Sequence, residues 1–264
     1  MFYCALMNEP AYPQSRSLLA GKTVLVTAAA GTGIGLATAK RCIEEGARVV
    51  ISDVHERRLA QAADMLSALA REPVLGVRCD VTQEADVQNL IASALGALGS
   101  IDVLVNNAGL GGTANVKEMT DEQWQRVLDV SLTGTFRMTR AVLGPMLERG
   151  SGVIVNNASV LGWRAQAGQA HYAAAKAGVM AFTRCVALEV AHAGIRVNAV
   201  APSLAAHPFL SKVTTEALLA ELTAREAMGR AAEPWEVANV IVFLASDLST
   251  YLTGEVLSVS SQHP

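Results

Sequence analysis

The sequence has no long uninterrupted apolar run and little excess charge of either sign. No stretch of 18 or more apolar residues is free of polar interruption, so we expect no transmembrane helix. The first twenty residues lack a basic start followed by a continuous apolar segment, which argues against a signal peptide. The net charge of −3 gives no electrostatic basis for binding nucleic acid or an anionic membrane.

Cysteine is also scarce, and its placement excludes several kinds of site. The four cysteines, Cys4, Cys42, Cys79 and Cys185, show neither paired nor metal-ligand spacing. Isolated histidines complete no metal triad, so we expect no metal site. Reduced thiols are typical of a cytoplasmic protein.

Short apolar runs alternate with longer helical segments along most of the 264 residues, without repeats, low-complexity runs or linkers. We expect strands near 22–27, 47–52, 73–79, 101–105, 152–157, 195–199 and 256–259. Helices are expected at 34–45, 56–70, 83–98, 121–148, 172–191 and 233–246, with Thr120 capping the fourth. Such alternation predicts one Rossmann-type, doubly wound α/β domain with about seven parallel strands, over residues 21–264. Residues 1–20 are expected to form an extension on the surface or on a partner subunit.

A glycine-rich turn follows the first expected strand. Gly31, Gly33 and Gly35 crowd this turn, where backbone must approach a pyrophosphate closely, with Thr32 and Ile34 between them. The next helix begins there, so its N-terminus can face phosphate. Asp53 ends the second expected strand, where a carboxylate can accept hydrogen bonds from ribose hydroxyls and repel a 2′-phosphate. This arrangement favours binding of NAD.

Tyr172 and Lys176 stand four residues apart, on one face of an expected helix. An ammonium beside a phenol lowers the phenol pKa, and a hydroxyl from Ser159 could hold a carbonyl or alcohol oxygen against it. Together these groups indicate proton transfer in the interconversion of a carbonyl and an alcohol.

In this order the motifs resemble the short-chain dehydrogenase/reductase family over about residues 21–260. They are the glycine turn, CDV (79–81), NNAG (106–109), Ser159, the Tyr172/Lys176 pair, RVNAVAP (196–202), GRAAEPWEVA (229–238) and TGE (253–255). The resemblance implies that Ser159 orients the substrate oxygen and Tyr172 is the general acid/base. Lys176 would depress the tyrosine pKa and, with Tyr172, contact the nicotinamide ribose. The other implied cofactor contacts are Asp80 and Val81 at the adenine, Asn107, Ala108 and Gly109 along the floor, and Pro202.

The sequence departs from the family pattern at three places. Ala28 stands where the family has its first glycine, and Gly31 could replace that glycine in a longer loop. Ser131 stands where the family has an asparagine that helps hold a water in the proton relay, which predicts an impaired or rerouted relay. After Pro202, Ser203 replaces a glycine and His207 a threonine, so contacts with the nicotinamide carboxamide are in doubt.

Residues from 203 to about 230 correspond to the family's substrate lid, and their apolar side chains predict an apolar pocket or, equally, the core of two small helices. Trp163, Arg164 and His207 are candidate substrate residues. Trp163 could stack on a flat ring, and Arg164 could pair with a substrate carboxylate or phosphate or form a structural salt bridge.

The expected helix 172–191 is apolar nearly all round, which fits burial within the monomer or a subunit interface. The resemblance implies association through this helix and the one at 121–148, and we favour a homotetramer.

Three functions remain open. The first is an NAD-dependent dehydrogenase of a hydroxyl on a hydrophobic ring or acyl-CoA substrate. VTAAAGTGIG, NNASVLGWRAQ, APSLAAH and SVSSQHP resemble an actinobacterial subgroup that oxidises a hydroxy-indane acyl-CoA from steroid (cholesterol) ring catabolism. The second is a 3-oxoacyl-thioester reductase of the fatty-acid type, which commonly prefers NADPH. The third is a non-catalytic, NAD(H)-sensing protein on the same fold.

Overall fold

The structure, a computed structural model, describes residues 10–206 and 216–262. Seven parallel strands form one sheet in the order β3-β2-β1-β4-β5-β6-β7. They are β1 (Thr23–Val26), β2 (Arg48–Asp53), β3 (Leu75–Arg78), β4 (Val103–Asn106), β5 (Gly152–Asn157), β6 (Ile195–Pro202) and β7 (Val256–Val259). The predicted single doubly wound α/β domain with about seven parallel strands is therefore confirmed.

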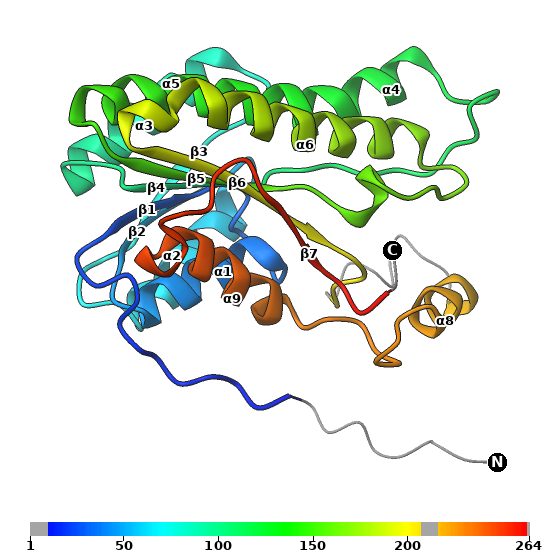
Figure 1. Ribbon diagram of the computed structural model, residues 1–264, viewed down its shortest axis with the longest axis horizontal. Coiled ribbons are helices and arrows are strands. Elements are labelled where there is room, and N and C mark those ends of the chain that lie inside the picture. Colours follow the sequence, from blue (N-terminus) through cyan, green and yellow to red (C-terminus); the bar gives the residue numbers. More distant parts are fainter. Residues whose placement is uncertain (1–9, 207–215, 263–264) are drawn as a thin grey trace.

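Helices cover both faces of the sheet (Figure 1). One layer contains α3 (Glu84–Leu98), α4 (Asp121–Leu128), α5 (Gly134–Arg149) and α6 (Ala170–Val190). The opposite layer contains α1 (Ile34–Glu44), α2 (Glu56–Ser67) and α9 (Pro234–Ala245). The central strands are buried on both faces, and their sequences are largely apolar, as in Thr23–Val26 (TVLV) and Val103–Asn106 (VLVN). Within the described residues no helix is both long and apolar enough to span a bilayer.

The expected helix at 121–148 is divided into α4 and α5. Thr120 caps α4 through a reciprocal capping box with Gln123, as the sequence predicted for the N-cap. A π-helical turn, Asp129–Thr133, then separates the two α-helical parts. Such turns are rare in α-helices and occur frequently at functional sites. This one contains Ser131.

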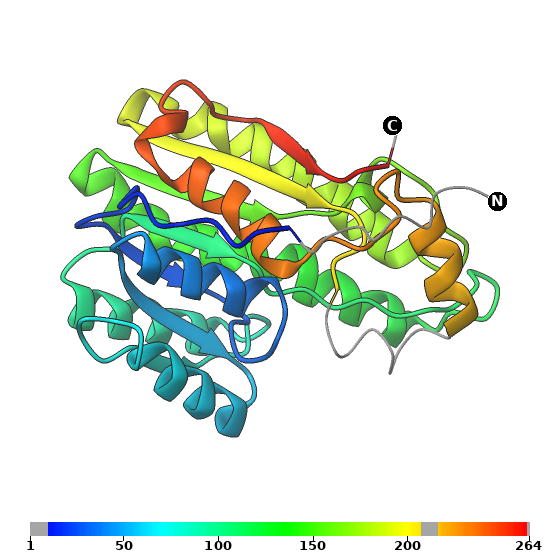
Figure 2. The same cartoon turned by 90° about the horizontal axis from the view of Figure 1, so that it is seen from below.

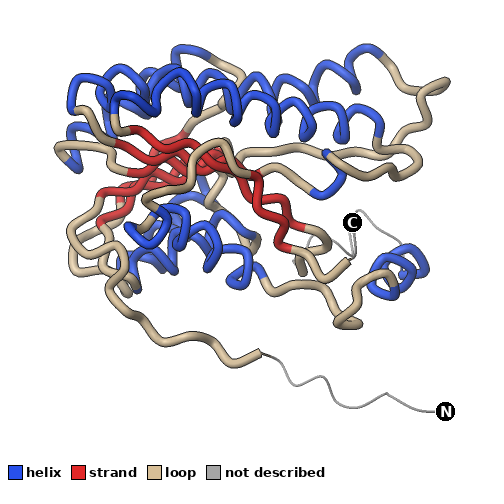
Figure 3. The backbone as a smooth tube through the Cα atoms, viewed as in Figure 1, coloured by secondary structure: helices blue, strands red, loops and turns tan. Residues whose placement is uncertain are grey.

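Helix α8 (Glu216–Ala224) lies apart from both layers, beyond the end of β7 (Figure 3). It belongs to the segment 203–230 that was predicted to cover the substrate. Residues 207–215 of that segment, including His207, lie outside the described residues.

The segment before β1 crosses the ends of α1 and α9 (Figure 2). Tyr12 donates a hydrogen bond to Glu44 at 2.7 Å, and its ring packs edge-on against Trp235. The buried carboxylate of Glu45 accepts from the backbone amides of Arg16 and Leu18 at 2.9 and 3.0 Å. It also forms an ion pair with Arg41 at 2.6 Å. Part of the predicted extension is therefore attached to the domain by specific contacts.

Candidate active site

The predicted site residues that the structure describes lie toward the carboxyl end of the sheet. Strands β1, β4, β5 and β6 all run in the same direction, so the residues that follow them meet along one edge. Ligands of open α/β sheets bind at this edge, where the strand order reverses. Here the reversal lies between β1 and β4, because successive strands lie on opposite sides of β1.

The glycine turn connects β1 to α1. No atom lies within 4 Å of the position that a Cβ would take at Gly31 or Gly33, so both face open space. At Gly35, by contrast, a Cβ would lie 2.4 Å from the Ala28 carbonyl oxygen and 2.5 Å from Nδ2 of Asn107. Gly33 is the N-cap of α1 and offers no side-chain cap, so the first amides of the helix can receive an anion such as a pyrophosphate.

Ala28 adopts the left-handed conformation, with φ of 51°. Gly31 is not among the glycines with positive φ. Ala28 thus takes the backbone geometry that glycine adopts without strain, and the replacement of the missing first glycine by Gly31 stays a prediction.

Asp53, the last residue of β2, lies beside this turn. Its carboxylate accepts hydrogen bonds from the backbone amides of Ala30 at 3.2 Å and His55 at 3.0 Å. Burial raises the pKa of Asp53, while the amide of Ala30 and the charge of Arg58 oppose that rise. An acceptor group held beside an open glycine turn suits ribose hydroxyls.

Asn107 joins the ends of three strands. Its Nδ2 donates to the carbonyl oxygens of Thr27 and Ala28 at 3.1 Å, and its Oδ1 accepts from Asn157 at 2.9 Å. The backbone amides of Asn107 and Ala108 both donate to the Thr27 hydroxyl at 3.0 Å. These contacts fix the backbone of Asn107 and Ala108, where the resemblance predicts contacts with the cofactor.

The implied adenine contacts lie at the end of β3. The carboxylate of Asp80 accepts from the backbone amide and the hydroxyl of Thr82 at 2.9 and 2.7 Å. Val81 is buried against Gly134, where a Cβ would lie 2.6 Å from the valine side chain. Contact of these two residues with adenine stays a prediction.

Ser159, Tyr172 and Lys176 come together at the end of β5 and the start of α6. The Ser159 hydroxyl hydrogen-bonds the Tyr172 phenol and accepts from the amide of Leu161 at 3.2 Å. One turn later, Nζ of Lys176 donates to the carbonyl oxygen of Asn157 at 2.5 Å and lies 5.6 Å from the centre of the tyrosine ring. Lys176 is only 2% exposed.

Burial is the largest cause of the pKa shifts of Tyr172 and Lys176. It raises the pKa of Tyr172, and the hydrogen bond from Ser159 opposes that rise only partly. Burial also lowers the pKa of Lys176 to about 8. The expected lowering of the tyrosine pKa by Lys176 is therefore not found in this structure. A neutral phenol beside a serine hydroxyl is suited to donate a proton to a carbonyl oxygen.

Ser131 contacts the loop that lies over the tyrosine. Its hydroxyl accepts from the amide of Leu110 at 3.0 Å and donates to the carbonyl of the same residue at 3.1 Å. In this loop, a Cβ at Gly109 would lie 3.3 Å from Nζ of Lys176, and one at Gly111 3.8 Å from the Tyr172 ring. The Ser131 side chain thus holds backbone in this structure, and its predicted place in a water relay stays a prediction.

Sequence reasoning missed part of this loop. Gly111 and Gly112 lie over Tyr172 and His171, respectively. Their signal was the run GLGG, which begins at the last residue of NNAG and permits close approach of backbone to ring.

The candidate substrate residues have different surroundings. Trp163 is 52% exposed and free to meet a ligand. Both terminal nitrogens of Arg164 donate hydrogen bonds to Gln262, to its side-chain and backbone oxygens. The predicted alternatives for Arg164 included a structural salt bridge, and no such ion pair forms within residues 10–206 and 216–262.

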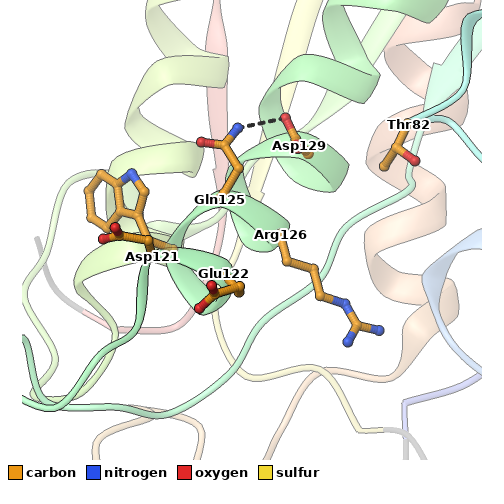
Figure 4. A pocket seen from close by; sticks show the side chains of 7 residues that line it. Thr82, Asp121, Glu122, Gln125, Arg126 and Asp129 are labelled. Atoms are coloured by element: carbon orange, nitrogen blue, oxygen red, sulfur yellow. Dashed lines mark hydrogen bonds between the residues drawn. The ribbon is translucent and has the colours of Figure 1, made fainter.

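A separate open hollow of about 750 Å³ lies along α4 (Figure 4). Its lining combines acidic side chains, Arg126 and Trp124 with Thr82 from the end of β3. It includes none of the predicted catalytic or substrate residues.

Comparison with known proteins places this geometry in a context. A family model described as Enoyl-(Acyl carrier protein) reductase matches residues 28–261. A Mycobacterium tuberculosis protein, (5R,7aS)-5-hydroxy-7a-methyl-1-oxo-2,3,5,6,7,7a-hexahydro-1H-indene-carboxyl-CoA reductase, is 64% identical over 248 residues. The match covers 94% of this chain and 95% of the relative.

Two further proteins extend the comparison. Cis-4-hydroxycyclohexanecarboxylate dehydrogenase of Sinomonas cyclohexanicum is 42% identical over 240 residues, 89% of this chain and 94% of that protein. The crystal structure of a short chain dehydrogenase from Mycobacterium smegmatis superposes with a TM-score of 0.87 at 55% identity. The superposition covers 98% of this chain and 99% of the chain in the crystal structure.

Proposed function

This chain belongs to the short-chain dehydrogenase/reductase family, and from that premise we propose that it is an NAD-dependent enzyme acting on a bicyclic, CoA-linked substrate. The chain is an oxidoreductase. Members of its family interconvert secondary alcohols and ketones with a nicotinamide cofactor. The proposed reaction converts a ring hydroxyl of a hydroxy-indane acyl-CoA to the ketone, or the reverse. The observation that carries this substrate is the 64% identity to the hydroxy-indene carboxyl-CoA reductase.

In the proposed mechanism, Tyr172 transfers the proton. Its phenol and the Ser159 hydroxyl lie next to each other, so a substrate oxygen placed beside both would meet two donors. Ser159 orients that oxygen, and Tyr172 donates the proton in the direction of reduction or accepts it in oxidation. Lys176, held by the Asn157 carbonyl, would contact the ribose next to the nicotinamide. When bound, the nicotinamide supplies or accepts the hydride.

The cofactor is proposed to be NAD rather than NADP. The open space at Gly31 and Gly33 and the uncapped start of α1 fit a pyrophosphate, with Thr32, Ile34 and Gly35 completing the turn. Asp53 supports the choice, since its carboxylate beside this turn would bind ribose hydroxyls and repel a 2′-phosphate. Asp80, Val81, Asn107 to Gly109 and Pro202 would complete the site.

Trp163 and Arg164 are proposed to meet the substrate at its entrance, together with His207 and the segment 203–230. The exposed indole of Trp163 can stack on a flat ring, and Arg164 can pair with an anionic group of the CoA moiety.

We further propose a cytoplasmic homotetramer. Large apolar side chains remain exposed on the layer formed by α4, α5 and α6, namely Trp124, Phe136, Leu147 and Leu188. Exposed apolar side chains of this kind mark association surfaces when they are contiguous. Light scattering of the purified protein distinguishes a tetramer from a dimer.

The test is turnover of a matched panel with NAD and with NADP. The panel contains the hydroxy-indane CoA thioester, ring hydroxysteroids and straight-chain 3-hydroxyacyl-CoAs, with Tyr172→Phe as the inactive control. We expect NAD-linked turnover of the ring thioester, abolished by Tyr172→Phe. Turnover of straight-chain thioesters with NADP would instead support the fatty-acid-type reductase. Tight NADH binding without any turnover would support the sensor, against which the assembled Tyr172–Lys176 pair argues.

A further inference from the structure

A buried carboxylate held by uncharged donors lies just after the end of α8. Glu226 is 4% exposed, and its two oxygens accept hydrogen bonds from the Ser261 hydroxyl at 2.8 Å and the Gln262 amide at 2.7 Å. It also accepts from the backbone amide of Leu204 at 3.3 Å and from the Ser203 hydroxyl. Within the described parts of the chain no lysine, arginine or histidine forms an ion pair with it.

These hydrogen bonds keep Glu226 ionised. Burial would raise its pKa, but the donors Ser261, Ser203, Gln262 and Leu204 outweigh burial and lower the pKa of the carboxyl. An ionised group that depends on uncharged donors constrains their orientation, because turning any of them away leaves a buried charge less satisfied.

The Gln262 side chain connects this carboxylate to Arg164. Its Nε2 donates to Glu226, and its Oε1 accepts from the guanidinium of Arg164. Both neighbours favour the same orientation of the amide, since a reversed amide would place its oxygen against a carboxylate and its NH₂ group against a guanidinium. The backbone oxygen of Gln262 accepts a second hydrogen bond from Arg164 at 3.2 Å.

The network joins segments that are far apart in the sequence but border one site. Arg164 follows Ser159 on the same connection after β5, Ser203 and Leu204 follow β6, and Gln262 follows β7. The last residues of the described chain and α8 lie beside each other at the carboxyl end of the sheet (Figures 1 and 2).

We propose that Gln262 and Glu226 are positioning residues that hold Arg164 ready for the anionic part of the substrate. This inference rests on the proposed contact between Arg164 and an acidic substrate. A neutral amide fixes the guanidinium without neutralising it, so the full positive charge remains for a phosphate or carboxylate. The role of Glu226 is indirect: it fixes the orientation of the Gln262 amide and does not itself compete with the substrate for Arg164.

The experiment compares two substrates that share the ring but differ in charge: the acyl-CoA thioester and the uncharged methyl ester of the same acid. The readout is the ratio of kcat/KM for the thioester to kcat/KM for the ester. Arg164→Ala should lower this ratio at least about tenfold, equivalent to about 1.4 kcal/mol. Gln262→Ala should lower it about three- to tenfold through KM for the thioester, and Gln262→Glu further, because a carboxylate would neutralise Arg164.

A neighbouring glutamine on the same connection, Gln166, provides the matched control. Gln166→Ala should leave the ratio as in the wild type, and thermal unfolding of each variant verifies that it folds. Glu226→Gln, which keeps the shape and removes the charge, serves as a second arm and should also lower the ratio.

The outcomes separate the substrate contact from the positioning role. If Arg164→Ala leaves the ratio unchanged, the proposed substrate contact is wrong, and the positioning role fails with it. If Arg164→Ala lowers the ratio but Gln262→Ala and Glu226→Gln do not, the substrate contact stands and the positioning role is overturned. Equal losses with both substrates would show a merely structural role for Gln262 and would also overturn the inference.

Discussion

The carbonyl oxygen of Ala28 accepts a hydrogen bond from the side-chain amide of Asn107 at 3.1 Å, which holds an alanine in the left-handed conformation. The same carbonyl lies where a side chain on Gly35 would clash. Left-handed backbone costs a residue with a Cβ roughly 1–2 kcal/mol, and glycine avoids most of that cost. The turn therefore stores strain at a position where the family pattern has glycine.

Ala28→Gly should increase the free energy of unfolding by about 1 kcal/mol, after allowance for the greater flexibility of glycine in the unfolded chain. For a domain of this size the thermal midpoint should rise by about 2–4 °C. Ala29→Gly, at a buried neighbour without positive φ, is the control and should destabilise. A lower midpoint for Ala28→Gly would show that Ala28 is not strained.

The lowered pKa of Lys176 predicts that the free energy of unfolding depends on pH. Its pKa is about 8 in the folded protein, against an ordinary lysine value of 10.5 that we take for the unfolded chain. Below pH 8 both states carry the proton, and the folded protein bears the full cost of a buried charge. Between pH 8 and 10.5 only the folded state loses its proton, so the free energy of unfolding rises with pH.

The comparison is with Lys176→Met, which lacks this titration. The stability of the wild type relative to the variant should rise between about pH 7 and 10 by up to about 3 kcal/mol, measured by urea unfolding. A difference that is constant over this range would contradict the lowered pKa.

Asp53 should control the choice of cofactor. Asp53→Ser removes the charge that would repel a 2′-phosphate and leaves the nearby positive charge of Arg58 to attract it. We expect the preference for NADH over NADPH, measured as the ratio of dissociation constants by fluorescence titration, to fall at least about tenfold. Arg58→Ala combined with Asp53→Ser should recover part of the preference. An unchanged ratio in Asp53→Ser would place the ribose elsewhere.

Ser131→Ala should weaken the loop over Tyr172. It leaves the amide and carbonyl of Leu110 without the hydroxyl that now pairs with both, at a cost of about 1–3 kcal/mol. We expect a lower thermal midpoint and a lower kcat, whereas Ser131→Asn, which can also donate and accept, should retain more of both. An unchanged rate across the pH range would exclude both a loop-holding and a relay role.

The sequence predicts the sheet well because each central strand is buried on both faces and reads as an apolar run. Strands β5 and β7 have the predicted bounds, and α6 begins two residues before the predicted start. The division of the helix at 121–148 could not be predicted, since DVSLT has no proline or glycine to mark a π-helical turn.

For the candidate site, the four-residue spacing alone predicts that Tyr172 and Lys176 lie together. The order of the family motifs predicts that Ser159 joins them. The titration of the cluster needs the structure, because burial by the glycine loop depends on contacts that no local pattern encodes. The network of Arg164, Gln262 and Glu226 could not be predicted for the same reason, because its members lie on segments that are far apart in the sequence.

The contacts of Tyr12, Arg16 and Leu18 bear on where this domain begins as a folding unit. A chain shortened to Gly21 would remove the two backbone amides that Glu45 accepts from and leave that carboxylate with Arg41 alone. The carboxyl-terminal end of α1, whose other end faces the glycine turn, would lose its anchor at the same time. The boundary that matters for engineering, for affinity tags or for fusion partners therefore lies upstream of Tyr12.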